Sequence, residues 1–168
     1  MKKLISLMLS LVMLLSITAN AAVVSNYEFV KSAGRGWELV EEDNIVYFAD
    51  GNGGVRIIDA NDINNLIELG QIKTGFDTRI VEKNKEVLYV GGGNQLITYN
   101  IKDPANTFIV KTDSIHTNAA RMNMDGNLLG VFGGASAQIF DVSKRSQPVK
   151  VATITGMGTG QCGYLKDG

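Results

Sequence analysis

The sequence contains one cysteine, Cys162, and one histidine, His116, among its 168 residues. A lone cysteine excludes a disulfide bond within the chain, so the fold has to be held together by its core. A lone histidine without a cysteine or acidic partner at ligand spacing does not form the pattern of a zinc site. No motif links the two residues, and a cysteine nucleophile activated by histidine is therefore not predicted.

Basic residues and proline are also scarce. Without Lys2 and Lys3 the chain carries 14 basic and 17 acidic side chains, a net charge of −3. No basic stripe is visible, so nucleic acid is not an expected partner. The chain has only two prolines but 19 glycines. This composition excludes a disordered Pro/Gly linker and favours many short strands joined by tight turns.

The one long apolar run is Leu4–Ile17, whose 14 residues fall short of the roughly 18–20 needed to span a bilayer. It follows two lysines and precedes the small residues Ala19-Asn20-Ala21. This pattern predicts a signal peptide over residues 1–21, cleaved after Ala21, with no membrane span afterwards. The mature protein is expected in the periplasm, on the cell surface or in the medium. An uncleaved anchor is the alternative.

One hairpin pattern occurs three times, ending at Asp59, Asn100 and Asp141, with an interval of 41 residues both times. Each copy has an apolar strand, a glycine-rich turn and a second strand, and further apolar segments stand before and after it. Four short strands in each unit of about 40–45 residues are typical of a β-propeller blade. An antiparallel sandwich is the alternative, although a sandwich has no reason to keep a 41-residue register. We expect the three repeated polar residues to hydrogen-bond the turn that follows each of them.

We therefore predict an all-β fold of the β-propeller type with four-stranded antiparallel blades. Residues 34–74, 75–117 and 118–156 are assigned to blades 1–3, 22–33 to the N-terminal strand of a closing blade, and 157–168 to the start of a fourth. Three and a half blades do not close a ring, so we expect an incomplete open arc that is the N-terminal fragment of a longer propeller. Its end blades are expected to promote self-association.

The register also predicts three equivalent core positions, Ile58, Tyr99 and Phe140. Each is the last bulky residue of the strand that follows the glycine turn. Bulky residues on both faces of such strands indicate sheets that are packed between neighbours. We expect all three side chains to be almost fully buried.

The units resemble the LVIVD-repeat proteins, whose repeats read approximately as a YVA-type strand, a G-G-L turn, an R-I-V-D strand and then S-D-P. The match is close in "YFADGNGGVRIID" at 47–59 and looser in the other two units, where Asp103-Pro104 keeps the end of the motif and Lys144-Arg145 departs from it. The resemblance spans about residues 34–168. It implies a secreted or surface propeller without a common catalytic motif.

Candidate binding residues gather where the first strands of the blades would line a central channel. Glu38, Asp77, Arg79 and Arg121 are predicted near the channel mouth, with His116 on a loop leading into it. Convergent arginines suit an anionic ligand. The alternative is that these charges neutralise one another at a solvated rim.

Two further positions have alternatives. Asp50 and Asn52 in the "DGNGG" turn are a weak calcium candidate, but the twelfth position of such a loop falls on Asn61 rather than on a bidentate acid, which favours a plain hairpin turn. Trp37 opens an apolar segment and is expected in the core rather than on a ligand-binding face.

These patterns predict an exported non-enzymatic repeat protein that acts as a binding or interaction scaffold for an unknown protein or surface ligand, without a cofactor. The alternative is a propeller enzyme or ligand-binding protein that holds an anion or a metal ion in its central channel. A truncated remnant without activity is a further alternative.

Overall fold

The computed structural model describes residues 34–115, 120–157 and 163–166. The predicted signal peptide 1–21, the predicted strand 22–33, His116 and Cys162 lie outside the described residues. Within the described ranges the fold is all-β, and no helix occurs there. None of these ranges contains a helix that is long and apolar enough to cross a membrane.

Twelve strands form three antiparallel sheets of four, in the orders β1-β2-β3-β4, β5-β6-β7-β8 and β9-β10-β11-β12. Sheet 1 consists of β1 Glu38–Glu42, β2 Ile45–Ala49, β3 Val55–Asp59 and β4 Ile67–Ile72. Sheet 2 consists of β5 Ile80–Asn84, β6 Val87–Gly92, β7 Gln95–Asn100 and β8 Phe108–Ser114. Sheet 3 consists of β9 Arg121–Asp125, β10 Leu128–Gly133, β11 Ser136–Asp141 and β12 Val149–Thr155. The predicted four-stranded antiparallel units are confirmed.

The tight turns between strands depend on residues that tolerate a positive φ angle. Gly93 and Gly134, which occupy equivalent turns of sheets 2 and 3, have φ angles of 57° and 59°. Glycine adopts this left-handed conformation without a steric penalty, so it suits the glycine-rich tight turns predicted here.

The repeated polar residue at the end of the third strand caps the following turn in every sheet. The backbone N–H of Asn61 donates to Asp59 Oδ1 at 2.8 Å, that of Lys102 donates to Asn100 Oδ1 at 3.0 Å, and that of Ser143 donates to Asp141 Oδ1 at 2.8 Å. The hydrogen bonds predicted from the 41-residue repeat are thus present in all three copies.

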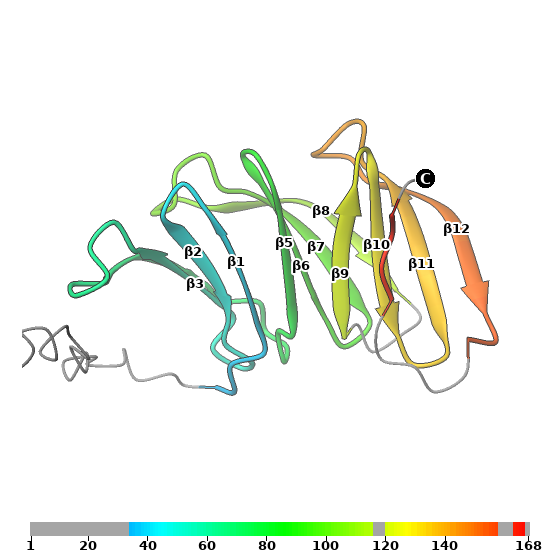
Figure 1. The fold of residues 1–168 in the computed structure, drawn as a ribbon, viewed down its shortest axis with the longest axis horizontal. Helices are drawn as coiled ribbons and strands as arrows, with labels where there is room; N and C mark the ends of the chain where they lie inside the picture. The colour runs from blue at the N-terminus through cyan, green and yellow to red at the C-terminus, as the bar shows by residue number, and fades with distance from the viewer. Residues whose placement is uncertain (1–33, 116–119, 158–162, 167–168) are drawn as a thin grey trace, which may run out of the picture.

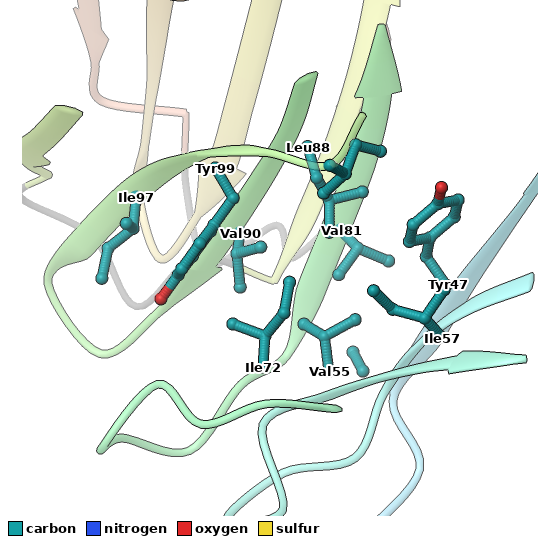
Figure 2. Close-up of a cluster of buried hydrophobic side chains, with 11 residues drawn as sticks. Tyr47, Val55, Ile57, Ile72, Val81, Leu88, Val90, Ile97 and Tyr99 are labelled. Atoms are coloured by element: carbon teal, nitrogen blue, oxygen red, sulfur yellow. The ribbon is translucent and has the colours of Figure 1, made fainter. Parts of the chain in front are cut away.

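The three sheets stand in a row in chain order, as Figure 1 shows, and their faces pack against one another. Tyr47, Val55 and Ile57 of sheet 1 meet Val81, Val90 and Tyr99 of sheet 2 in one core cluster, which Figure 2 shows. A second cluster joins sheets 2 and 3. It contains Ile80, Tyr89, Leu96, Leu129, Val131 and Phe140. Sheet 2 therefore contributes both of its faces to the core.

The alternation of side chains explains one wrong prediction about this core. Tyr99 and Phe140 are 4% and 1% exposed, as expected, and each faces the sheet that precedes its own. Ile58 occupies the same position in sheet 1, but it is only half-buried. Among the described residues, no sheet precedes sheet 1. Ile57, the residue before Ile58 in β3, points to the opposite face, packs against sheet 2 and is fully buried. The three positions are equivalent in register, and Ile58 is half-buried because no described sheet lies against its face of sheet 1.

Residues 163–166 pack against β9 and β10 of sheet 3, and Figure 1 draws them in red alongside β10. The side chain of Asn123 on β9 donates to the carbonyl of Leu165 and accepts from its N–H, both at 3.1 Å. A side chain on Gly163 would collide with the Phe132 ring, since its Cβ would lie 2.0 Å from a ring carbon. Among the residues that the structure describes, none covers the outer strand β12 in this way, and all seven of its residues are exposed.

Candidate functional site at the inner strands

The first strands of the three sheets, β1, β5 and β9, lie next to one another. They bring together residues that are about 40 positions apart in the sequence. A backbone bridge between Gly51 and Thr78 fixes the start of β5 against the turn of sheet 1: Gly51 N–H donates to Thr78 at 3.1 Å, and Thr78 N–H donates back at 2.9 Å. Thr78 is fully buried. The β2–β3 turn and the segment ahead of β5 are therefore held in a fixed relation.

Four polar and aromatic side chains gather at the beginning of β1 and β5, and we call them the Trp37 cluster: Arg35, Trp37, Asp77 and Arg79. The guanidinium carbons of Arg35 and Arg79 lie 5.3 and 5.0 Å from the centre of the Trp37 ring. Both distances are within the range of a cation–π interaction. Trp37 Nε1 donates to Asp77 Oδ1 at 3.3 Å, and Arg79 Nε donates to Asp77 Oδ2 at 2.9 Å. Asp77 thus orients both the indole and one of the two guanidinium groups.

The Trp37 side chain is 43% exposed, so the prediction that it belongs to the core was wrong. The physical reason is its position. It precedes the first residue of β1, and it shares a side of that strand with Leu39, which is 58% exposed, while Val40 on the other side packs against the core. Sequence reasoning also missed Arg35, although its spacing of two from Trp37 was a usable signal.

A second group lies further along the inner strands and contains Glu38, Glu82 and Arg121. Glu38 Oε2 accepts a hydrogen bond from the backbone N–H of Val81 at 3.2 Å, which links β1 to β5. Burial raises the pKa of Glu38, and the hydrogen bond and the charge of Arg121 oppose that shift. Arg121 is itself exposed.

Glu82 has the more perturbed pKa of the two acids. Burial, and then the charge of Glu38, raise its pKa to about 7, while Arg121 acts in the opposite direction. Sequence reasoning did not select Glu82. Glu82 is equivalent in the repeat to Val40 of β1 and Asn123 of β9, because the three residues pair with equivalent positions of the second strand in each sheet. The repeat therefore placed Glu82 on the same face of its sheet as Val40 and Asn123.

The structure therefore separates the predicted channel-mouth residues into two groups. Asp77 and Arg79 belong to the Trp37 cluster, and Glu38 and Arg121 belong to the acidic group with Glu82. His116, the fifth predicted residue, lies outside the described residues.

Asp50, the calcium candidate, has a different partner. Its fully buried carboxylate accepts a hydrogen bond from Arg56 Nε at 2.8 Å, and a second nitrogen of Arg56 pairs with Glu68 at 2.8 Å. The other candidate, Asn52, is exposed. Within the ranges that the structure covers, no three His, Cys, Asp or Glu residues are grouped as metal ligands would be. The geometry assigns Asp50 to a buried ion pair with Arg56 and gives no support to a calcium site.

Comparison with known proteins adds information on the fold alone. No protein-family model and no curated protein matches the chain, so the resemblance to LVIVD repeats stays a hypothesis. Among solved structures, it is similar to a functionally unknown protein from Desulfotomaculum acetoxidans DSM 771, at 12% sequence identity and a TM-score of 0.62. That similarity covers 74% of this chain and 46% of the other, so the chain spans less than half the length of that protein.

Proposed function

We propose that this chain is an exported, non-enzymatic binding protein of the β-propeller type, and that the Trp37 cluster is its binding surface. The observation that carries the proposal is an exposed indole held close to two guanidinium groups and oriented by a carboxylate. Tryptophan and arginine are the residues most enriched among binding hot spots. An exposed aromatic side chain fixed in this way has little conformational freedom left to lose when a ligand binds.

The propeller interpretation is supported by the arrangement of the sheets. Four-stranded sheets with a 41-residue repeat pack face to face, and their first strands lie side by side, as the innermost strands of propeller blades do. The LVIVD resemblance in residues 47–59 agrees with this interpretation. We propose the open arc of about three and a half blades as the form of this chain.

Export is supported by the N-terminal sequence. Lys2 and Lys3, the apolar run Leu4–Ile17 and Ala19-Asn20-Ala21 follow the order of a secretory signal. The net charge of −3 for the chain without Lys2 and Lys3 favours a protein or surface ligand over nucleic acid.

An enzyme is the second candidate function, and Glu82 is the observation that favours it. A half-buried carboxyl whose pKa is raised to about 7 beside a second acid is suited to general acid–base catalysis. In this candidate Arg121 would hold an anionic substrate next to Glu38 and Glu82.

Two measurements on the purified exported chain separate these candidates. A binding array of acidic, neutral and basic peptides and glycans should give saturable binding that Trp37→Ala abolishes. Tyr164→Ala serves as the matched control, because Tyr164 is an exposed aromatic residue outside the cluster. The second measurement is a hydrolase panel together with metal analysis. Turnover that Glu82→Gln or Arg121→Ala abolishes, or stoichiometric bound metal, would overturn the binding-protein proposal.

A further inference from the structure

We infer that the Trp37 cluster binds a monoanionic carboxylate attached to an apolar group, with the carboxylate on Arg35 and the apolar group on Trp37 and Leu39. This inference rests on the proposed binding function and specifies the ligand class. The ligand chemistry follows from the charge, the exposure and the fixed geometry of the cluster.

The net charge of the Trp37 cluster indicates how many negative charges the ligand carries. The cluster contains two guanidinium groups and one carboxylate, and Asp77 is paired with Arg79 at 2.9 Å. Arg35 forms no ion pair or side-chain hydrogen bond with any other residue of the described ranges, and its guanidinium is held near Trp37 by the cation–π contact. One positive charge thus remains available. The planar fork of a guanidinium matches a carboxylate in bidentate geometry.

The exposed apolar surface of Trp37 and Leu39 indicates that the rest of the ligand is apolar. Trp37 and Leu39 are 43% and 58% exposed and are two residues apart on the same side of the chain at the start of β1. This apolar strip adjoins the guanidinium of Arg35 through the Trp37 ring. An apolar group attached to the carboxylate would cover the strip and remove it from water.

Asp77 disfavours a phosphate or sulfate ester. Its carboxylate lies within hydrogen-bonding distance of both Trp37 and Arg79, so a dianion on this surface would face a fixed negative charge. Repulsion between like charges at short range is only partly screened at a half-exposed site. A single negative charge on Arg35 avoids this repulsion.

The cluster is also preorganised. Gly51 packs against the backbone of Arg35 and the side chain of Asp77, since a Cβ at Gly51 would approach the backbone nitrogen of Arg35 to 2.9 Å and Asp77 Oδ1 to 3.1 Å. The φ angle of Gly51 is 52°, and its backbone is bonded to Thr78. The ligand therefore meets side chains whose supports are already in place.

The fluorescence of Trp37 tests this inference directly, because Trp37 is the only tryptophan in the chain. The exported chain is titrated with cyclohexanecarboxylate, with the neutral cyclohexanecarboxamide and with inorganic phosphate. We expect saturable quenching or a spectral shift with the carboxylate and affinities weaker by about tenfold or more for the other two. The amide lacks the charge that strengthens a hydrogen bond to Arg35, and phosphate lacks the apolar group and is repelled by Asp77.

Variants assign the carboxylate to Arg35. Arg35→Ala should weaken the binding of cyclohexanecarboxylate by about tenfold or more, and Arg35→Lys by an intermediate factor, since lysine keeps the charge but lacks the fork. Lys102→Ala, which removes an exposed positive charge from the β7–β8 loop, should stay within about twofold of the unchanged chain. Circular dichroism melting confirms that the variants are folded.

The inference would be overturned by equal affinity for the amide, by tighter binding of phosphate, or by unchanged affinity in folded Arg35→Ala. Binding of none of the three probes would also overturn it. The broader binding function would survive that last result if the array still showed binding that depends on Trp37, so the two proposals fail separately.

Discussion

The ionisation of Glu82 affects the stability of this protein. Its pKa rises from 4.5 to about 7 on folding, first because of burial and then because of the negative charge of Glu38. A raised pKa means that the folded state binds the proton more tightly than the unfolded state. The resulting stabilisation is fully present below pH 4.5 and is lost as the pH rises through about 7.

Glu82→Gln keeps this position neutral at every pH, so it should raise the melting temperature at pH 8 and have little effect near pH 4. Thermal unfolding followed by circular dichroism at both values measures the difference. Glu86→Gln is the matched control, because it makes the same change at an exposed acid in the β5–β6 turn. Parallel pH profiles for Glu82→Gln and the unchanged chain would contradict the prediction.

Substitutions of Phe140 and Ile58 test how much a neighbouring sheet adds to the unfolding free energy that a core side chain contributes. Phe140 is 1% exposed between sheets 2 and 3, so Phe140→Ala should cost about 3–5 kcal/mol of unfolding free energy. Ile58 is half-buried on the outward face of sheet 1, and Ile58→Ala should cost only about 1 kcal/mol. Urea unfolding measures both values. Equal losses would mean that another segment covers Ile58 in solution.

The sequence predicted the sheets better than the surfaces between and around them. The 41-residue interval located the strands and the capping residues Asp59, Asn100 and Asp141, because those depend on local backbone geometry. It could not show that Ile58 is half-buried or that Trp37 is exposed, because both depend on how the sheets pack. Glu82 was missed for a similar reason, since its raised pKa arises from burial in the folded protein and from the charge of Glu38 on β1, which is distant in the sequence.

At the scale of the elements, the loop between the third and fourth strands is a repeated turn. Asp62 and Asp103, at equivalent positions, each accept a hydrogen bond from the backbone two residues later, at 2.9 and 3.0 Å. The third copy has Lys144 there. Its backbone carbonyl still closes the turn by accepting from Gln147 N–H at 2.8 Å. The turn therefore forms without the acid, but it lacks one hydrogen bond.

Lys144→Asp should restore that bond, with the backbone N–H of Ser146 as the donor. We expect the melting temperature to rise by about 1–4 °C, the usual effect of one net hydrogen bond in a domain of this size. Lys150→Asp makes the same change of charge on the exposed strand β12, where no turn amide is available, and should give no such gain. A similar rise in both variants would attribute the effect to net charge instead.

At the scale of the whole molecule, the sheets form a linear series in which each contacts only its neighbours. Such a series is stabilised mainly through its interfaces, and its two ends have the least support. Sheet 2 is covered on both faces, and every residue of β6 is buried. At the end of the series β12 is an edge strand with Val149, Val151 and Ile154 at 57%, 56% and 49% exposure.

An exposed apolar edge strand offers unpaired backbone groups and apolar surface to a second copy of the chain. We therefore expect the apparent mass of the exported chain, measured by size-exclusion chromatography with light scattering, to rise with concentration. Val151→Lys places a charge on this edge and should reduce the association without lowering the melting temperature, because Val151 is already 56% exposed. Asn94→Lys adds the same charge to an exposed turn of sheet 2 and should leave the association unchanged.

A chain that stays monomeric at every concentration would show that the β12 edge is protected in solution. Equal suppression by both variants would instead indicate that net charge controls the association.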